Sequence, residues 1–355
     1  MSTVYKLPRG AYLDDAWFRR EQEALIGRTW TLVASTDELP DPGDYVAAVV
    51  ADAPILVVRG EAGELRAFHN LCRHRGMVML EGAGNVGTSI DCVYHQWRYD
   101  LDGALRVVPQ RKEQFPRLDP ACWGLLPAAL DVWQGMVFVH PDPSAPSLHS
   151  YLGVIPDALG SFRPGLLTQV AHDLIDARCN WKLFVENHVD VYHLWYLHEE
   201  TLGDFDHTQF SHETVDGHWV SYEPLRAPRF DEARLAAGTR AITHLDERDR
   251  TGISALLAFP NLMFATSAEF FATYRAVPVA PDRSVIDLRI RAEPGADAEA
   301  LLKSLHSFIS EDIAACEAVQ RGMRSPRFSV GPLARTHERP ITRFHDRVLA
   351  ALADP

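Results

Sequence analysis

The spacing of apolar and polar positions changes several times along the chain, and each change predicts a different kind of element. Residues 13–29 carry apolar side chains at helical spacing, which predicts a helix near the N-terminus. From about 44 to 140 the pattern becomes short β-type runs separated by turn residues, which predicts a small all-β unit. Residues 141–150 are rich in proline and serine, so we expect a linker there.

The second half of the chain mixes both patterns. Strands are expected over 165–178, 258–279 and 284–292, and helices over 180–200 and 296–322, the latter ending at Gly322. Residues 203–243 are mixed and polar and are expected to be partly loop. These patterns predict an α+β protein with an N-terminal helical segment at 1–38, an all-β domain at 39–150 and a second domain at 151–355.

Composition narrows the function classes. The 355 residues carry a formal charge of −13, which argues against a general nucleic-acid-binding role because such proteins need a basic surface. The sequence shows no signal peptide and no apolar run long enough to span a membrane. Five cysteines in so long a chain do not form a disulfide framework. We therefore expect a cytoplasmic protein in which paired Cys and His residues bind metal.

Two short motifs combine such residues. Cys72 and His74 lie in "CRHRG", and Cys92 and His95 lie in "CVYHQW". Zinc fingers usually pair Cys with Cys and His with His, whereas here each loop contributes one of each. A Rieske [2Fe–2S] cluster needs this alternation, because two thiolates bind one iron and two imidazoles bind the other. A structural zinc ion or a metal-free set is the alternative interpretation.

The segment "GAGNVG" at 82–87 matches the glycine pattern of dinucleotide-binding loops. Such a loop must follow a strand and open a helix, but here strand-like residues follow. We interpret it as a loop between the two ligand pairs.

A second candidate metal site lies in "NWKLFVENHVDVYHLWYLH", residues 180–198. On a helix with Asp190 at 0°, His193 falls at about −60° and His198 at about +80°. A π-bulge between the two histidines would bring them closer together. Two His and one carboxylate form the ligand set of a non-haem Fe(II) site. His207 and His212 repeat the spacing, but without this context we expect them in a loop near the site, and His188 is expected to point away.

Together these motifs resemble those of Rieske non-haem iron oxygenases, specifically the terminal oxygenase (alpha) subunit. The resemblance implies that Cys72, His74, Cys92 and His95 bind the [2Fe–2S] cluster of a Rieske domain at 39–150. The second loop departs from the common Cys-Pro-Tyr-His-Gly-Trp pattern, because Val93 replaces the proline and Gln96 the glycine.

The same resemblance implies a catalytic domain at 151–355, with an antiparallel sheet around a long C-terminal helix. In that domain His193 and His198 would bind a mononuclear Fe(II). Asp312 would be the third ligand, and Glu311 and Glu317 are the alternatives.

The family also implies an assembly. Its members are typically trimers in which the cluster of one subunit serves the iron of its neighbour. Asp190 would then bridge His193 and the neighbour's His95. Electrons would come from a separate NAD(P)H-dependent reductase or ferredoxin, and the iron would use O₂ to hydroxylate or demethylate a small organic substrate.

The C-terminal stretch "EDIAACEAVQRGMRSPRFSVGPLARTHERPITRFH", residues 311–345, resembles the choline and glycine-betaine monooxygenase branch. This resemblance implies a quaternary ammonium or methylated amine substrate. An aromatic cage suits such a cation, and six side chains are candidates: Phe205, Trp219, Phe259, Phe264, Phe270 and Phe271. An aromatic or carboxylate substrate is the alternative, with Arg275 as a candidate for holding the acid group. Two more distant alternatives are a non-catalytic Rieske electron carrier and a zinc-stabilised binding module.

Overall fold

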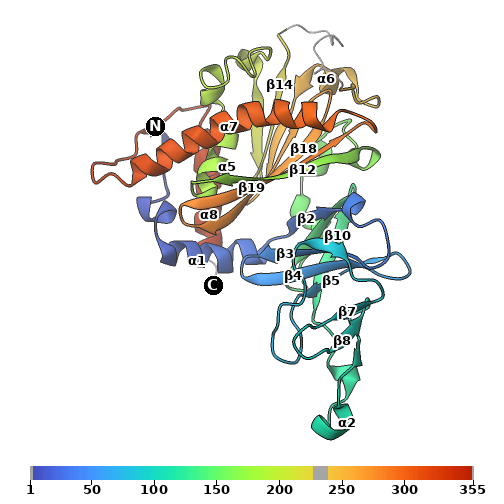
Figure 1. The fold of residues 1–355 in the computed structure, drawn as a ribbon. Coiled ribbons are helices and arrows are strands. Elements are labelled where there is room, and N and C mark those ends of the chain that lie inside the picture. Colours follow the sequence, from blue (N-terminus) through green and yellow to red (C-terminus); the bar gives the residue numbers. More distant parts are fainter. Residues whose placement is uncertain (1–2, 227–238, 354–355) are drawn as a thin grey trace. The chain divides into compact units, whose positions relative to one another are not determined.

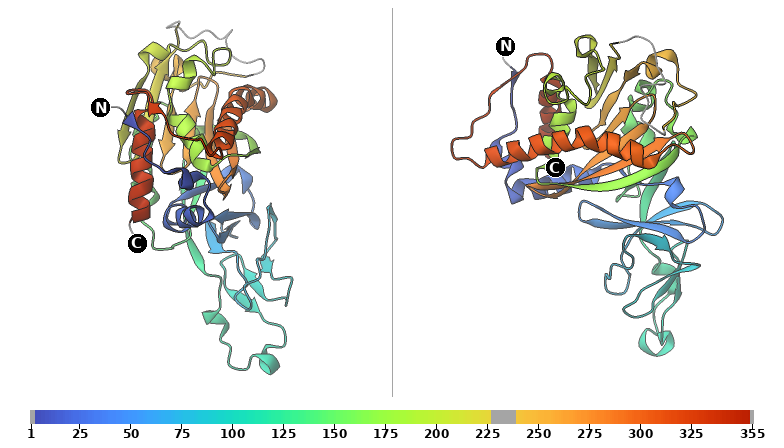
Figure 2. Two further views of the ribbon diagram at one scale, coloured as in Figure 1. Left: turned by 90° about the vertical axis from the view of Figure 1, so that its left-hand side faces the viewer. Right: turned by 45° about the horizontal axis from the view of Figure 1, so that its top comes forward.

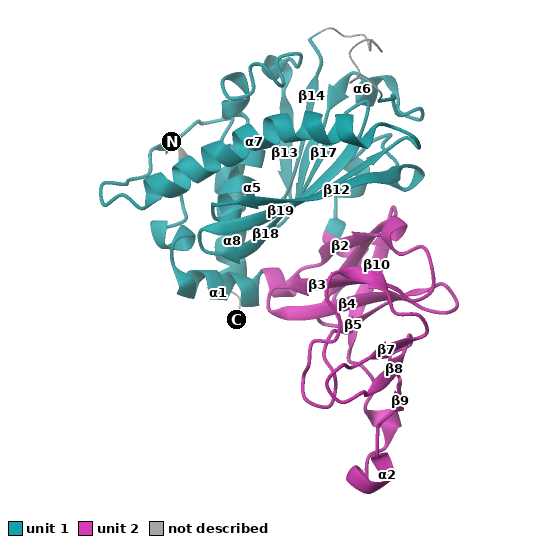
Figure 3. Ribbon diagram, viewed as in Figure 1, with its two compact units in different colours: residues 1–25, 152–355 teal, residues 26–151 magenta. Residues whose placement is uncertain are grey.

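The computed structural model describes residues 3–226 and 239–353, and they form two units (Figure 3). One unit comprises residues 26–151, and the other comprises 1–25 and 152–355. Residues 26–38, which the sequence pattern assigns to the N-terminal segment, lie in the first of these because strand β2 (Thr31–Ser35) joins its sheet. Part of the polar stretch expected at 203–243, residues 227–238, lies outside the described residues.

The unit of residues 26–151 is built on antiparallel strands, as the alternating pattern predicts (Figure 1). Its larger sheet has the order β2-β11-β10-β5-β4-β3-β6, and a smaller one has the order β7-β8-β9. The remaining strands are β3 (Asp44–Val50), β4 (Ala53–Arg59), β5 (Leu65–His69), β6 (Ala83–Asn85), β7 (Ser89–Asp91), β8 (Arg98–Asp100), β9 (Leu105–Val107), β10 (Pro127–Trp133) and β11 (Met136–His140).

Strand β4 separates two hydrophobic cores in this unit, because successive side chains of a strand point to opposite faces. Ile55 and Val57 belong to one core, whereas Leu56 and Val58 belong to the other. The second core also contains Cys72 and Cys92, so the Cys-His loops rest on packed side chains. The glycine motif at 82–87 leads into β7 without opening a helix, as expected. It is not wholly a loop, however, because it contains strand β6, which pairs with β3.

The second unit contains an eight-stranded antiparallel sheet with the order β12-β19-β18-β17-β16-β14-β13, and β15 pairs with β14. Its strands are β12 (Thr168–Ala177), β13 (Ser211–Val215), β14 (His218–Pro224), β15 (Gly252–Ile253), β16 (Ala255–Ala258), β17 (Leu262–Thr266), β18 (Phe271–Ala280) and β19 (Arg283–Ala292). A two-stranded ladder joins β1 (Thr3–Val4) to β20 (Pro332–Leu333).

The long helix α7 (Ala298–Met323) runs across this sheet (Figure 2) and packs against α5 (Trp181–Val189) and β12. Asp297 caps its N-terminus by accepting the N–H groups of Glu299 and Ala300. Gly322 lies inside the helix rather than at its end. The other helices are α1 (Asp15–Ala24), α2 (Arg111–Gln114), α3 (Leu148–Leu152), α4 (Ile155–Ala158), α6 (Glu247–Arg250) and α8 (Arg339–Ala353). Of these only α1 corresponds to a predicted helix, and α8 is the longest that the pattern does not predict.

The helix expected over 180–200 ends early, so that expectation is wrong and no π-bulge is needed. Helix α5 stops at Val189, and Asp190 has extended dihedrals of φ −83° and ψ 117°. Its side chain accepts the N–H of Tyr192 at 2.7 Å, a local bond that competes with helix continuation. His193 then lies on a separate 3₁₀ helix, η6 (Tyr192–Trp195). The chain can therefore turn His193 and His198 toward one point.

These elements confirm the expected fold class of an all-β domain joined to a domain with an antiparallel sheet and a long C-terminal helix. In the part of the chain that the structure describes, no helix is both long and apolar enough to cross a membrane.

Candidate functional site

The two Cys-His loops have the same backbone geometry. In the first, the N–H of Cys72 bonds to the carbonyl of Met77 at 2.8 Å, and the N–H of Gly76 bonds to the carbonyl of Cys72 at 2.9 Å. In the second, Cys92 bonds to Trp97 at 2.9 Å and Gln96 bonds to Cys92 at 2.9 Å in the same directions. The loops thus present their Cys and His side chains as a matched pair.

Gln96 shows how the departure from the usual glycine is accommodated. Its φ is +56°, close to the +71° of Gly76 at the matching position of the first loop. The left-handed conformation is retained although glutamine tolerates it less well than glycine. The loop geometry therefore does not depend on a glycine at 96.

The side chains of the loops fit a two-iron cluster. Cys72 and Cys92 are buried, and the rings of His74 and His95 lie 4.5 Å apart. His74 Nδ1 is buried and has no hydrogen-bond partner among the described residues, which leaves it available to a metal. A structural zinc site requires four ligand atoms that converge on one point, and these four residues do not converge in that way. Within the described ranges, the one group of three or more His, Cys, Asp or Glu residues with ligand atoms close together lies in the other unit.

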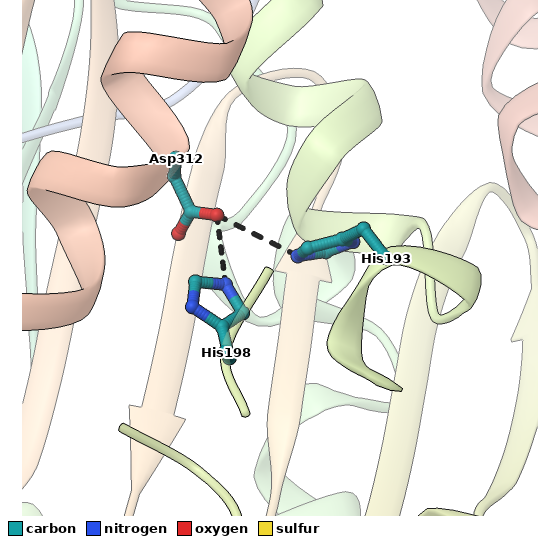
Figure 4. A group of neighbouring side chains, drawn as sticks. All are labelled: His193, His198 and Asp312. Carbon is teal, nitrogen blue, oxygen red and sulfur yellow. Dashed lines mark hydrogen bonds and ion pairs between the residues drawn. The ribbon is translucent and has the colours of Figure 1, made fainter. Parts of the chain in front are cut away.

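That group is His193, His198 and Asp312, whose ligand atoms all lie within 4.8 Å of one another. Asp312 projects from α7 toward both imidazoles (Figure 4). Its Oδ1 lies 2.9 Å from His198 Nε2 and 3.5 Å from His193 Nε2. Two imidazoles and one carboxylate are the ligand set that suits non-haem Fe(II).

Each imidazole also faces a second carboxylate on its far side. His193 Nδ1 lies 3.4 Å from Asp190 Oδ2, and His198 Nδ1 lies 2.7 Å from Glu311 Oε2. Such partners fix the tautomer and the ring orientation of a metal-binding histidine. Glu311, an alternative ligand by sequence, thus lies behind His198, and Glu317 instead accepts the backbone N–H of Arg178.

The charges at this site are tightly coupled. Although burial opposes the charged imidazole, Asp190 and Asp312 raise the pKa of His193 to about 9. Burial alone would raise the pKa of the Asp312 carboxyl, but hydrogen bonds from His193 and His198 hold it below its usual range. Asn187 Nδ2 donates to Asp312 Oδ1 at 2.8 Å and fixes that carboxylate. A bound metal cation would neutralise the charge of the Asp312 carboxylate, which the protonated imidazoles neutralise here.

The other histidines of the region are placed differently from the expectation. His207 is buried on the short helix η7 (His207–Gln209) against Glu223, and His212 lies on β13, so neither belongs to an irregular loop. His188, expected to point away, instead lines the same cavity as His193 and His198. Its Nε2 bonds to the carbonyl of Leu256 at 3.0 Å, and burial lowers its pKa to about 4. Sequence reasoning missed the pairing of His207 with Glu223, because the two residues meet only when the sheet forms.

A cavity of about 1070 Å³ opens beside the His193, His198 and Asp312 group, and all three residues line it. Of the aromatic cage candidates, Phe205, Trp219 and Phe270 line the cavity, whereas Phe259, Phe264 and Phe271 do not. Arg275 is also absent from the wall and pairs with Asp287 at 3.2 Å, so its proposed role in holding a substrate carboxylate is wrong.

The cavity wall is acidic. Among its described residues are seven carboxylates but only two lysine or arginine side chains, Arg250 and Lys303. Asp190 and Asp312 belong to the candidate metal centre, which leaves five further carboxylates. The enclosed space therefore favours a positively charged or neutral ligand over an anionic one.

This combination of a Cys-His-loop domain with a two-histidine, one-carboxylate centre is the architecture of a Rieske non-haem iron oxygenase. Residues 29–127 match the Rieske [2Fe-2S] domain family, and residues 165–354 match the family described as "Ring hydroxylating alpha subunit (catalytic domain)". The chain belongs to the ring-hydroxylating alpha-subunit family. It is an oxygenase with a Rieske [2Fe–2S] cluster and a mononuclear iron.

Relatives of known name agree with this assignment. The chain is 27% identical to the glycine betaine monooxygenase oxygenase subunit of Chromohalobacter salexigens, over 96% of this chain and 84% of the relative. It is 27% identical to the chloroplastic choline monooxygenase of Spinacia oleracea, over 95% of this chain and 76% of the relative.

The fold is also that of solved structures. The quaternary ammonium Rieske monooxygenase CntA, in complex with its substrate L-carnitine, superimposes with a TM-score of 0.81 at 24% identity. The match covers 99% of this chain and 96% of CntA. Oxygenases of this class take electrons from a separate reductase and form oligomers.

Proposed function

We propose that this oxygenase oxidises an N-methyl group of a small quaternary ammonium compound or methylated amine. In this proposal Cys72, His74, Cys92 and His95 hold the cluster. His193, His198 and Asp312 hold the mononuclear iron. The observation that carries the proposal is that these last three residues converge on the wall of an acidic cavity.

The iron, when bound, supplies O₂ activation with electrons from the cluster, and three protein ligands leave positions open for O₂ and substrate. The protein's residues position the site. Asn187 holds Asp312, and Asp190 and Glu311 orient His193 and His198. The cavity then has to place the carbon that is oxidised.

The lining supports a cationic substrate. Trp219 and Tyr274 are buried on the wall, and aromatic faces attract quaternary ammonium groups. Carboxylates outnumber cationic side chains on the same wall. The relatives named above act on glycine betaine, choline and carnitine according to their names, which agrees with a substrate of this class.

We also propose a homotrimer in which Asp190 bridges His193 and His95 of the next subunit. Exposed aromatic and apolar side chains beside both partners support such a contact. Tyr192 and Tyr196 are 48% and 72% exposed near Asp190, and Val93 and Tyr94 are 67% and 53% exposed near His95. A cytoplasmic NAD(P)H-dependent reductase or ferredoxin would supply the electrons.

The test is substrate-dependent O₂ consumption by the purified holoprotein with a surrogate reductase. Choline, glycine betaine and carnitine would be compared with 3,3-dimethylbutan-1-ol, the neutral isostere of choline, and with biphenyl. We expect at least one ammonium compound to stimulate O₂ uptake with stoichiometric product, and the neutral isostere to be much poorer. Coupled turnover of biphenyl without turnover of any ammonium compound would overturn the proposal.

A further inference from the structure

Strand β14 places three side chains of very different character on the cavity wall. Trp219, Ser221 and Glu223 all line the cavity, as expected for alternate residues that share one face of a strand. At about 3.3 Å per residue, the α-carbons of Trp219 and Glu223 are about 13 Å apart. The wall therefore changes from aromatic to acidic over the length of a small molecule.

Small side chains form the part of the wall between these two ends. Ser221 Oγ donates to the carbonyl of Ala255 at 2.8 Å, and Ala255 is opposite Ala265 on the next strand. Ser221, Ala255 and Ala265 all line the cavity. Larger residues in this row would fill the space, so the row provides room for the substrate.

The aromatic end lies toward the candidate iron. The His188 ring lies 5.7 Å from the Trp219 ring and 6.2 Å from the Tyr274 ring. Burial raises the pKa of Tyr274, and the charge of Asp312 raises it further, so Tyr274 lies within electrostatic reach of this metal ligand. A methylammonium group oxidised at the iron would rest against these rings.

Glu223 forms the other end of this row on β14 and is buried, with 2% of its surface exposed. Its carboxylate contacts His207 Nδ1, and the neighbouring charges are those of Asp206 and Arg226. The His207 ring that it contacts is still within electrostatic reach of His193 and His198. Burial, reinforced by Asp206, raises the pKa of Glu223 to about 7. The other acidic side chains outside the metal centre include Glu199, Glu200 and Asp204, which are exposed at the cavity.

We propose that Glu223 determines which substrates are accepted by contacting the end of the substrate remote from the oxidised N-methyl group. It favours a hydroxyl, an amine or a second positive charge at that end and disfavours a carboxylate. The inference rests on the proposed function and narrows it: the preferred substrate is a choline-like amino alcohol or a polyamine-like cation rather than a betaine. A carboxylate placed against a buried like charge loses affinity.

The experiment measures kcat/KM and, by calorimetry, the dissociation constant for choline and glycine betaine in the holoprotein. Glu223→Gln removes the charge and keeps the shape. Glu213→Gln is the matched control, because Glu213 is an exposed acid on the adjacent strand β13 that does not line the cavity. At pH 8 we expect the choline-to-betaine ratio to fall about tenfold in Glu223→Gln and to stay constant in Glu213→Gln.

A second measurement needs no variant. In the wild-type protein the same ratio should rise between pH 6 and pH 8, as Glu223 ionises beside Asp206, His207 and Arg226. Oxidation of both compounds with a ratio that is insensitive to pH and to Glu223→Gln would overturn this inference and leave the proposed function intact. If neither compound binds or is oxidised by the wild-type protein, the proposed function fails and the inference fails with it.

Discussion

Single residues show where this chain can depart from its family's pattern. Gln96 has the same left-handed backbone conformation in the second Cys-His loop as Gly76 has in the first. The cost of a left-handed non-glycine residue is about 1 kcal/mol, which one surface loop can absorb. A β-branched side chain in the same conformation costs more, because its second branch clashes with the backbone.

We therefore predict that Gln96→Val destabilises the cluster-binding loop by about 1–2 kcal/mol, whereas Gln96→Gly stays within about 1 kcal/mol of the wild type. Loss of the visible absorbance of the cluster on heating measures both. A valine variant as stable as the wild type would show that the left-handed conformation is not needed for cluster binding.

Glu311 holds the imidazole of His198 from the side away from Asp312. Its carboxylate bonds to His198 Nδ1 at 2.7 Å and accepts the hydroxyl of Thr201 at 2.9 Å. Glu311→Gln should weaken binding of the mononuclear iron by about 10- to 100-fold, since it removes the charge that orients the imidazole. Iron titration into metal-depleted protein measures this, with the cluster absorbance as the internal control. Unchanged affinity would mean that Glu311 has no role in holding His198.

At the scale of elements, strands and helices follow the hydrophobic pattern well, and their ends do not. The pattern predicts α7, because a long amphipathic repeat is strongly specified, and it also predicts most strands of the first unit and β12, β17, β18 and β19 of the second. It does not predict α8, nor β13 and β14, which lie in the polar stretch expected to be partly loop. It overextends α5, because the side chain of Asp190 competes for a backbone N–H in a way that periodicity does not register. The pattern also does not predict the contact between Glu223 and His207, because that contact depends on how the strands pair across the sheet.

A buried ion pair attaches helix α5 to helix α1. Lys182 Nζ lies 2.7 Å from Glu21 Oε1, and both side chains are fully buried. Glu21 also accepts the indole N–H groups of Trp17 and Trp181, at 2.9 and 3.0 Å. Removal of one partner leaves a buried charge uncompensated.

We predict that Lys182→Met destabilises this unit by about 3–5 kcal/mol, which lowers its melting temperature by roughly 10 °C. The double variant Lys182→Met with Glu21→Gln should recover much of the loss, because no unpaired charge remains. Calorimetric scans of the wild type, Lys182→Met and the double variant measure the three melting temperatures. Equal melting temperatures for the wild type and Lys182→Met would show that the pair contributes nothing.

At the scale of the whole molecule, the proposed trimer requires that the cluster of one chain serve the iron of another. A chain with Cys92→Ser lacks the cluster, and a chain with Asp312→Ala lacks the iron. Each should be inactive alone. Mixed trimers, obtained by co-expression with two different tags, should regain a substantial fraction of wild-type turnover. Mixed trimers as inactive as the two parents would refute transfer between subunits.

The most direct test of the central claim is the iron and sulfide content of the anaerobically purified protein. We expect about three irons and two labile sulfides per chain, from one [2Fe–2S] cluster and one mononuclear iron. Asp312→Ala should retain about two irons and two sulfides. Two irons per chain in both proteins, or zinc without sulfide, would contradict it.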